Sequence, residues 1–596
     1  MDTVYSPLSA VTRELVAVAT GRIPADVVIR GGKVINVFTR EILSWDIAVK
    51  NGRIATVGDV AHCIGPQTRV VDATNFYLAP GFLDGHLHVE SSMVSVTQFA
   101  RAVLPRGTTA IFMDPHEIAN VLGLEGVRLM VEEGRNLPLK VYATMPSCVP
   151  AAPGLEDAGA AFGPQEVALA MEWENIIGLG EMMNFPGVLN GDEKVHGEIR
   201  ATLEAGKPVT GHYALLETEK GLPAYAAAGI CCCHEATRAV DALARLRLGM
   251  YAMLREGSAA RDVRETVKSL TENCVDPRRA VLVTDDTHPE TLLSQGHMDH
   301  VLRRAIGEGL NPLTAIQAVT LNTAECFGLS QDLGSIAPGR WADIVFLSDL
   351  AAVRVEKVMV AGREVAEGGR LLIELPEPAY PDEVRNSVQL KEPLTADHFA
   401  IPAPPGRSSV KARIIQVLEG SILTKHLIQE VPVEDGQVKA SSEADIAKVA
   451  VVERHRGTGT RGVGLVKGFG FKAGALASTV AHDSHNLIIV GTDEADMALA
   501  GNTLARCGGG MAVVRGGRIL ALLPLPLAGL MSDQPVETVA KQVEEVLKAS
   551  RELGCQMTSP FMTMAFVALP VIPELRLTNR GLVDVLRFEL VPVIAE

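Results

Sequence analysis

Between residues 80 and 330 the sequence alternates short apolar runs with longer amphipathic ones, and this alternation limits the fold more than any other feature. Stretches of helical pattern such as HGEIRATLEAG separate apolar runs of strand length. Eight such strand–helix units predict an α/β fold whose parallel strands close into a (β/α)8 barrel. The connections after the fifth and sixth runs are short for this fold. The eight runs are FLDGHLH, TTAIFMDPHE, KVYATMPSCV, IIGLGEMMN, PVTGHY, ICCCHEA, MYAMLREGS and AVLVTDDT.

A different, β-rich pattern lies on both sides of this block. After a helical start, residues 26–59 alternate apolar and polar side chains between Gly-rich turns, and residues 334–369 do the same. We therefore expect a small β-sandwich domain formed by segments flanking the barrel, followed by a Pro-rich linker and a C-terminal α/β domain. The predicted parts are an N-terminal segment with part of the sandwich, the barrel, the rest of the sandwich, the linker and the C-terminal domain, at 1–79, 80–330, 331–385, 386–404 and 405–596.

Charge and cysteine content narrow the classes of function. The 596 residues include 71 acidic and 55 basic ones, for a formal net charge of −16. This balance disfavours binding to nucleic acid or to an anionic membrane. The N-terminus lacks the pattern of a signal peptide, and no run approaches the ~20 apolar residues of a membrane span. The nine cysteines form no repeated CxxC pair, so reduced thiols in a cytoplasmic protein are expected.

The first apolar run ends in a metal-ligand pattern. His86 and His88 are two residues apart on an extended chain, so both imidazoles point to the same face. At the carboxyl end of a barrel strand, that face is the mouth where active sites lie. Neutral imidazole is a common ligand of divalent metals. We therefore predict metal binding here rather than two structural histidines of a surface loop.

Four later runs also end in a ligand-type residue. Taken singly, each has an ordinary explanation, as a satisfied core histidine or a helix-capping acid. Together with the first pair they give four histidines and two carboxylates, enough for two metal ions that share a carboxylate. Asp286 directly follows the last of them, so the sequence leaves open which aspartate acts. The six predicted ligands are His86, His88, Glu181, His212, His234 and Asp285.

This order of ligands resembles the amidohydrolase superfamily, with Glu181 in place of the carboxylated lysine of many members. Longer stretches are similar to the microbial adenine deaminase family within it, and the similarity covers nearly the whole chain. The stretches that carry it are GFLDGHLHVESSM, TTAIFMDPHEIANVLG, GLGEMMNFPGV, VTDDTHPETLL and, in the C-terminal part, GFGFKAGALASTVAHDSHNLIIVGTD.

The resemblance implies hydrolytic deamination of adenine to hypoxanthine and ammonia, a reaction of purine salvage. It also implies two divalent metal ions per chain, manganese or iron more than zinc, and a homodimer. The metals would activate a water molecule for attack on C6 of the base. Asp285 is our candidate for moving the proton of that water, and Glu181 or Asp114 is the candidate for protonating N1.

Further polar residues are candidates for binding the purine. Glu90 and Ser91 follow the HxH pair. Asp114, His116 and Glu117 end the second strand, and Asp114 and His116 share a face because side chains alternate along a strand. The C-terminal stretch contributes another group, which we interpret as closing the substrate pocket; a further metal site and a simple polar loop are the alternatives. That group is His482, Asp483 and His485.

Two other functions remain to be weighed. One is a different amidohydrolase reaction, on a cyclic amide, a modified purine or an N-acetyl sugar, and the C-terminal resemblance disfavours it. The other is a noncatalytic scaffold, which is disfavoured because all six ligand positions are filled. The zinc deaminases that carry a PCxxC signature are excluded, because the chain has no such motif.

Overall fold

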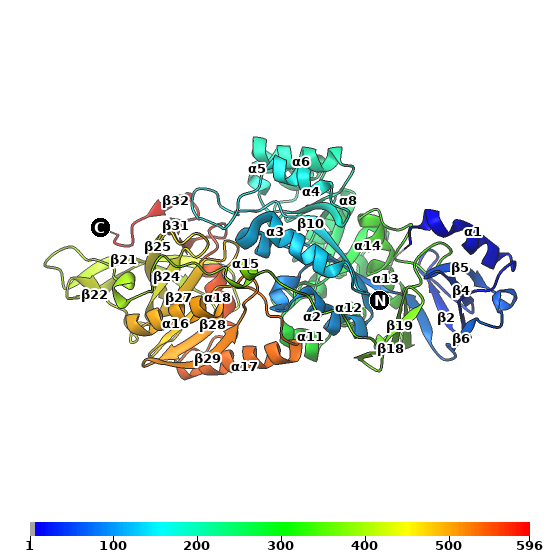
Figure 1. The fold of residues 1–596 in the computed structure, drawn as a ribbon. Helices are drawn as coiled ribbons and strands as arrows, with labels where there is room; N and C mark the ends of the chain where they lie inside the picture. Colours follow the sequence, from blue (N-terminus) through cyan, green and yellow to red (C-terminus); the bar gives the residue numbers. More distant parts are fainter. Residues whose placement is uncertain (1–5, 596) are drawn as a thin grey trace.

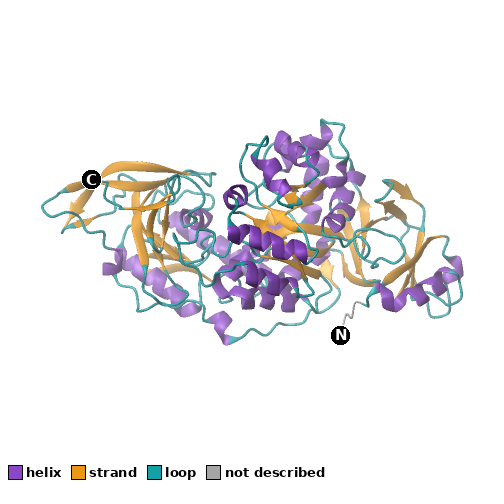
Figure 2. Cartoon of the chain, turned by 90° about the horizontal axis from the view of Figure 1, so that it is seen from above, coloured by secondary structure: helices purple, strands orange, loops and turns teal. Residues whose placement is uncertain are grey.

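The computed structural model describes residues 6–595 and divides into three parts placed in a row. In Figure 1 the N-terminal β-rich part lies at one end, the barrel in the middle and the C-terminal domain at the other end. Figure 2 gives the same order from above, with helices gathered around the central part and strands dominating both ends. The barrel therefore contacts both other parts.

The β-rich segments on the two sides of the barrel form one sandwich, as predicted. A four-stranded sheet has the order β5-β4-β1-β6, and a seven-stranded sheet has the order β20-β19-β18-β17-β7-β2-β3. Buried side chains of both sheets, such as Ile47 and Phe346, meet in one apolar cluster between them. The strands are β1 (Val27–Arg30), β2 (Lys33–Asn36), β3 (Glu41–Leu43), β4 (Asp46–Lys50), β5 (Arg53–Gly58), β6 (Arg69–Asp72), β7 (Tyr77–Pro80), β17 (Ile344–Asp349), β18 (Arg354–Val360), β19 (Arg363–Glu367) and β20 (Arg370–Leu371).

Helix α1 (Leu8–Ala19) covers this sandwich from outside. Its buried residues Val11, Leu15 and Val18 are spaced by four and three positions, so they form one apolar stripe. That stripe packs with Ala48 and Ala55 of the four-stranded sheet. The helical start expected from the sequence is therefore a surface helix with one buried face.

Eight parallel strand positions form the predicted barrel. Strands β8 to β12 pair in order, and β13 to β15 form a second parallel set. A bridge between Val209 and Ile230 joins the two sets, and β16 pairs with β8 to close the ring. The strands are β8 (Phe82–His88), β9 (Thr108–Met113), β10 (Lys140–Met145), β11 (Ile176–Met182), β12 (Val209–Gly211), β13 (Cys232–Cys233), β14 (Tyr251–Arg255) and, for the eighth position, β15 (Ala280–Val283) with β16 (Asp285–Asp286).

Helices connect these strands, and the two short connections still contain one each, α7 and α8. The barrel helices are α2 (Val96–Val103), α3 (His116–Gly134), α4 (Pro164–Met171), α5 (Phe185–Asn190), α6 (Glu193–Glu204), α7 (Gly221–Ala227), α8 (Ala239–Arg247), α9 (Val263–Thr266), α10 (Lys268–Thr271), α11 (Pro289–Ser294), α12 (Met298–Gly307), α13 (Pro312–Ala318) and α14 (Leu321–Cys326). Short 3-10 turns are η1 (Ala61–Cys63), η2 (Val89–Ser92), η3 (Leu104–Arg106) and η4 (Pro277–Arg279).

The C-terminal domain is built on a nine-stranded sheet with the order β23-β22-β21-β25-β24-β27-β26-β28-β29, beside a three-stranded sheet. Its strands are β21 (Ser409–Val417), β22 (Thr424–Glu434), β23 (Gln437–Val438), β24 (Ile446–Val452), β25 (Arg461–Lys467), β26 (Ala475–Ser478), β27 (Leu487–Gly491), β28 (Gly510–Arg515), β29 (Arg518–Pro524), β30 (Leu575–Thr578), β31 (Gly581–Asp584) and β32 (Glu589–Val591). Helix α15 (Asp382–Arg385) precedes the domain. The helical segments after it are η5 (Ala396–Phe399), α16 (Glu494–Cys507), α17 (Val536–Glu552) and α18 (Pro560–Val567).

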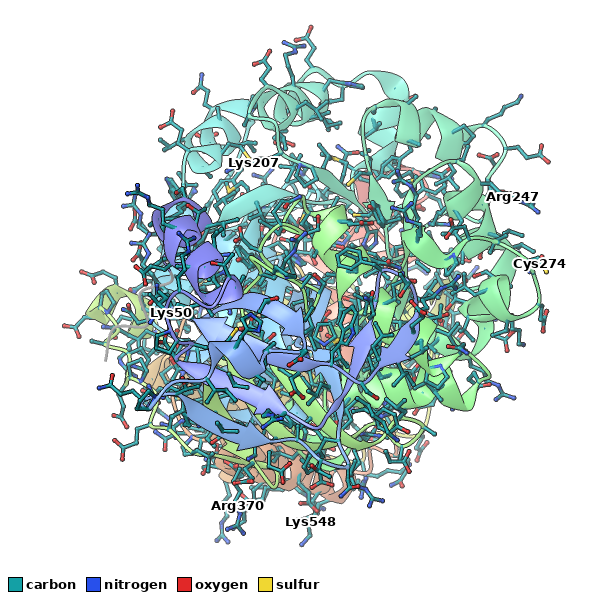
Figure 3. The ribbon with its side chains drawn as sticks, turned by 90° about the vertical axis from the view of Figure 1, so that its right-hand side faces the viewer. Lys50, Lys207, Arg247, Cys274, Arg370 and Lys548 are labelled. Atoms are coloured by element: carbon teal, nitrogen blue, oxygen red, sulfur yellow. The ribbon has the colours of Figure 1, made fainter. Side chains whose placement is uncertain are left out.

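The charged side chains lie mainly on the molecular surface. Side chains such as Arg370 and Lys548 project outward at the edge of the molecule (Figure 3). Among residues 6–595, no helix combines the length and the apolar character of a membrane span.

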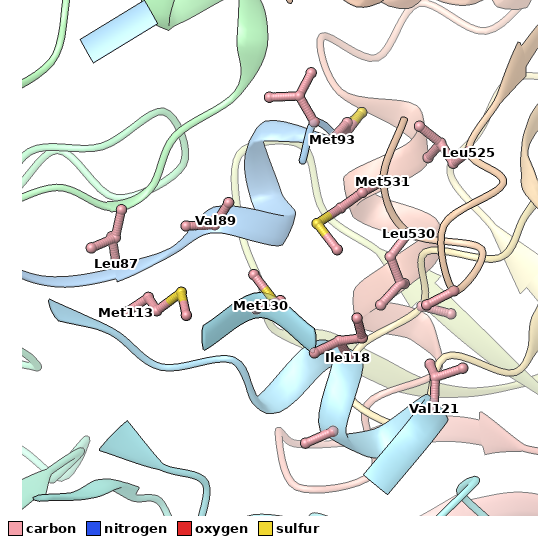
Figure 4. Packing of buried hydrophobic residues seen from close by; sticks show 14 of the residues in the cluster. Leu87, Val89, Met93, Met113, Ile118, Val121, Met130, Leu525, Leu530 and Met531 are labelled. Atoms are coloured by element: carbon pink, nitrogen blue, oxygen red, sulfur yellow. The ribbon is translucent and has the colours of Figure 1, made fainter. Parts of the chain in front are cut away.

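The barrel and the C-terminal domain share one buried core. Met93 and Ile118 of the barrel lie in the same cluster as Leu530 and Met531 of the C-terminal domain (Figure 4). Main-chain hydrogen bonds cross the same junction, because Ser532 N donates to Met93 O at 2.8 Å. The C-terminal domain is thus fixed directly beside the carboxyl end of β8.

Candidate metal centre and substrate pocket

The carboxyl ends of the barrel strands bring the six predicted ligands together. His86 and His88 are the last inward-facing residues of β8, and Asp285 reaches them from β16. The Nε2 atoms of His86 and His88 lie 3.8 and 3.3 Å from Oδ1 of Asp285. The imidazole rings of His86 and His234 stack with their centroids 4.0 Å apart. Together with Glu181 of β11 and His212 after β12, the six residues come from five different strand positions, as the parallel barrel requires.

Glu181 occupies the centre of the cluster. Its Oε2 lies 2.7 Å from Nδ1 of His212 and 3.0 Å from Nε2 of His234. Its Oε1 lies 3.6 Å from Nε2 of His88. One carboxylate thus contacts histidines on both sides, which is the arrangement expected of a bridging ligand.

The donor set fits divalent metal ions. Nδ1 of His88 bonds to the carbonyl of Asp114 at 2.9 Å, so this nitrogen carries the proton and the Nε2 lone pair points into the cluster. Nε2 of His86 is buried and has no hydrogen-bond partner among residues 6–595. Buried imidazoles and carboxylates this close together are costly unless cations or protons compensate them. Two overlapping groups, each including Glu181, satisfy the spacing for a metal ion.

Asp285 and Asp286, which the sequence did not distinguish, have different surroundings. Asp285 faces His86 and His88, and its Oδ2 accepts a hydrogen bond from Arg255 Nη1 at 3.0 Å. Its backbone φ of 63° lies in the left-handed region, which is uncommon for a residue other than glycine. Asp286 instead accepts a hydrogen bond from the Ser91 hydroxyl. The geometry therefore favours Asp285 as the aspartate of the metal cluster.

Asp114 and His116 both lie close to Glu181, but not because they share one face of the second strand, as the sequence predicted. Strand β9 ends at Met113 and His116 begins helix α3, so the two residues do not share the face of one strand. Oδ2 of Asp114 accepts the backbone N–H of Glu181 at 2.7 Å, and Nδ1 of His116 lies 3.3 Å from Oε1 of Glu181. A Cβ atom at Gly180 would lie 2.3 Å from Asp114 Oδ2, so glycine permits this approach.

A narrow pocket lies beside the cluster, with one wall from the barrel and one from the C-terminal domain. Of the predicted substrate-binding residues it contains Glu90, Ser91, His482 and His485, whereas Asp483 lies with His116 and Cys148. Oε1 of Glu90 accepts the backbone N–H of Ile118 at 3.1 Å, and its buried Oε2 has no partner among the described residues. Burial, together with the nearby Glu117 carboxylate, raises the pKa of Glu90 to about 7.

Glu117 joins the two walls of this pocket. Its Oε1 lies 2.7 Å from Nδ1 of His482, and its Oε2 forms a short contact with Nε2 of His485. Nδ1 of His485 accepts the backbone N–H of Ala481 at 3.1 Å, so the proton of the neutral ring lies on Nε2 and is donated to Glu117. A metal ligand needs a free lone pair at that nitrogen. The contacts therefore favour a role in the pocket over a further metal site.

Several residues of the site were not identified from the sequence. Arg255 ends β14 and contacts both Asp285 and Glu235, and its place at a strand end could have marked it. Glu117 was expected at the end of the second strand with Asp114 and His116, but it lies in the first turn of α3. No pattern in the sequence marks Leu530 or Met562, which line the pocket from the C-terminal domain.

Comparisons with known proteins agree with this architecture. Residues 77–365 match the amidohydrolase family, and residues 421–589 match the adenine deaminase C-terminal domain. The chain is 71% identical to an adenine deaminase of Moorella thermoacetica over 99% of both chains. It is 55% identical to an adenine deaminase of Clostridium botulinum over 99% of this chain and 98% of that protein. It is 52% identical to adenine deaminase 3 of Rhizobium meliloti over 99% of both chains.

Proposed function

This chain belongs to the amidohydrolases, in the family of adenine deaminases, and from that premise we propose that it hydrolyses adenine to hypoxanthine and ammonia. The observation that carries the proposal is Glu181, a buried carboxylate surrounded by histidines from several strands beside a pocket that the C-terminal domain completes. The cluster supports the hydrolysis, and the similarity to adenine deaminases, including their C-terminal domain, supports adenine as the substrate.

The metal centre is proposed from the donor set. Divalent metals are the cofactors of the family, and we propose two per chain, manganese or iron rather than zinc. Bound there, they supply a water molecule of lowered pKa. The proposed ligands are the two histidines of β8, the histidines that follow β12 and β13, Asp285 and the central Glu181, which contacts both groups of histidines.

Asp285 is the proposed proton carrier. In the overall reaction, one proton of the attacking water ends on the leaving amino nitrogen and the other on N1 of the product. Asp285 lies in the cluster with a carboxylate oxygen 3.3 Å from the His88 ring, and Arg255 holds its other oxygen. A carboxylate fixed in this way can take a proton from water and return it to the amino group.

Asp114 is the better of the two candidates for protonating N1. Burial raises the pKa of Asp114 to about 6, so this carboxyl can hold a proton near neutral pH. Burial opposes ionisation of Glu181 too, but His212 and His234 outweigh it and hold the pKa of Glu181 well below its usual range. Glu181 is therefore suited to remain an anion at the centre of the cluster.

Purine binding is proposed for the polar residues of the pocket. The unpaired Oε2 of Glu90 provides an acceptor or, when protonated, a donor for the edge of the base, and Ser91 lies next to it. His482 and His485 act from the opposite wall. His116 and Asp483 lie in a neighbouring group, and we assign them to the support of this wall.

We further propose a cytoplasmic enzyme that acts as a homodimer in purine salvage. All nine cysteines are free, which is usual for a reducing compartment. The net charge of −16 is consistent with a small substrate rather than a nucleic acid or membrane partner.

The test is ammonia release from adenine by protein reconstituted with Mn²⁺ or Fe²⁺, with the metal content measured in the same sample. Two metals per chain with rapid formation of hypoxanthine are expected. Two metals without conversion of adenine would retain the metal centre and reject adenine as the substrate; cyclic amides, modified purines and N-acetyl sugars would then be assayed in the same way.

A further inference from the structure

Three cysteine side chains meet at a second place in the barrel. Cys231 directly precedes β13, Cys232 begins that strand, and Cys326 ends α14. Their three sulfur atoms all lie within 4.8 Å of one another. Nothing in the proposed deamination uses these residues.

The cysteines lie at the opposite end of the strands from the catalytic cluster. His234 follows β13, whereas Cys231 precedes it, and three residues of extended chain span about 10 Å. The Cys231 carbonyl accepts the backbone N–H of Tyr251, the first residue of β14, at 2.8 Å. Arg279, which precedes β15, stacks on the Tyr251 ring. The three cysteines thus lie at the amino-terminal end of the barrel strands, the floor of the barrel, and the catalytic cluster lies at the carboxyl end, the mouth.

The surroundings of the three thiols differ. Cys232 and Cys326 are buried in an apolar cluster with Phe112 and Phe327, whereas Cys231 is only partly buried and packs against that cluster. Hydrogen bonds from Cys232 and Cys326 to the Cys231 sulfur hold the pKa of Cys231 well below its usual range, and the nearby Arg279 acts in the same direction. The group therefore has one less buried cysteine, Cys231, and two fully buried ones whose sulfur atoms lie close to its own.

We propose that Cys231, Cys232 and Cys326 bind one thiophilic d10 cation, Cu(I), at the floor of the barrel. Three sulfur donors without an oxygen or nitrogen ligand select soft cations and disfavour Mn²⁺ or Fe²⁺. Structural zinc sites have four protein ligands, and this group offers three among the described residues. Three-coordination by sulfur suits Cu(I), which enters past Cys231 and displaces the thiol protons.

The bound cation would connect β13 to α14. These two elements are nearly one hundred residues apart in the chain, and apart from the thiols they meet here through apolar packing. A ligand that binds only the folded state stabilises it in proportion to the logarithm of its concentration over Kd. Copper loading is therefore expected to raise the melting temperature without a requirement for turnover.

The first experiment is competition for Cu(I) with the chromogenic chelator bicinchoninate, under anaerobic conditions, using enzyme already loaded with Mn²⁺. All proteins would carry Cys274→Ser, because Cys274 is exposed and projects from the rim of the molecule (Figure 3). We expect the parent protein to withdraw one equivalent of Cu(I) from the chelator. Cys326→Ser should bind Cu(I) at least 10-fold more weakly. The matched control Cys555→Ser changes a buried cysteine of the C-terminal domain and should bind as the parent does.

A second measurement uses the native chain and does not depend on the folding of a variant. Alkylation followed by mass spectrometry reports the reactivity of each thiol with and without one equivalent of Cu(I). Cu(I) should protect Cys231 and leave the exposed Cys274 reactive. Equal alkylation of Cys231 in both samples, or equal copper withdrawal by Cys326→Ser and its parent, would overturn the proposal. Tight binding of Zn²⁺ without Cu(I) binding would overturn the choice of cation.

Discussion

At the scale of single residues, Asp285 combines an unusual backbone with two charged contacts. Its φ is 63°, Arg255 holds one carboxylate oxygen, and His88 lies beside the other. The sequence predicted an aspartate at this strand end but not which of two neighbours. Consecutive residues of a strand point to opposite faces, and Thr284 interrupts the eighth strand between β15 and β16. The alternation along the sequence therefore could not show which of the two aspartates faces the cluster.

Asp285→Asn tests the proposed proton transfer. The amide keeps the shape of the side chain but cannot accept a proton from water, so kcat for adenine should fall about 10²- to 10⁴-fold. Metal content and thermal stability should change little by comparison. Steady-state kinetics and metal analysis on the same preparation would show this, and a kcat within a few-fold of the parent would remove Asp285 from the proton path.

Glu181→Gln tests the central carboxylate. Loss of one negative charge among buried histidines weakens the attraction for a cation, so fewer than two metals per chain should remain after dialysis. Metal analysis measures this directly. Glu198→Gln is a matched control, because Glu198 is also buried but pairs with Lys194 on a barrel helix. Full occupancy in Glu181→Gln would contradict the bridging assignment.

At the scale of elements, the strand ends were predictable and the walls of the pocket were not. Apolar runs that end in a ligand-type residue mark the mouth of a parallel barrel, because all carboxyl ends meet there. This reasoning reached His212 and His234 through their own short strands. It placed Glu117 at a strand end, whereas that residue lies in the first turn of α3, and it missed Met562, which lies on α18.

The segment from Ala481 to Asn486 is the element that brings the C-terminal domain into the pocket. His485 donates to Glu117, and its carbonyl accepts a hydrogen bond from the buried Arg454. His485 therefore holds Glu117 from a fixed backbone. Removal of the imidazole would leave a buried carboxylate short of one partner.

His485→Ala should accordingly weaken adenine binding more than it slows the reaction. We expect KM to rise about 10-fold or more, while two metals per chain are retained. His62→Ala, at an exposed histidine of the N-terminal part, should leave both constants unchanged. Loss of a metal ion in His485→Ala, with KM unaltered, would instead indicate that this cluster is a third metal site.

At the scale of the whole molecule, residues 147–163 tie the barrel to the C-terminal domain. Asp157 pairs with Arg580 at 2.7 Å, and its carbonyl accepts from Asn486. Glu156 is buried beside them and accepts the backbone N–H of Ala152 at 2.8 Å. The sequence indicated two domains here, but contacts between residues more than three hundred positions apart follow from no local pattern.

Glu156 should make this junction sensitive to pH. Burial raises its pKa to about 8 from a usual value of 4.5. Between these values the folded chain keeps a proton that the unfolded chain has lost, so stability falls as the pH rises from about 5 to about 8. Glu156→Gln removes this dependence, a difference on the order of 1–4 kcal/mol.

Melting temperatures measured across this range would test the effect. The melting temperature of Glu156→Gln should rise relative to that of the parent as the pH increases from 5 to 8. Glu544→Gln, on the exposed face of α17, should give a curve parallel to that of the parent. Parallel curves for Glu156→Gln as well would show that this carboxyl does not hold its proton in the folded chain.

The pocket wall contributed by the C-terminal domain has a consequence for the order of synthesis. The ribosome completes the last barrel ligand, Asp285, about 280 residues before it reaches Met562 of the opposite wall. At typical rates of elongation this interval lasts roughly a quarter of a minute to a minute. During that time the nascent chain has the residues proposed for hydrolysis but not those proposed to enclose the base. With these assignments, the selectivity for the base is acquired last, when the final domain docks.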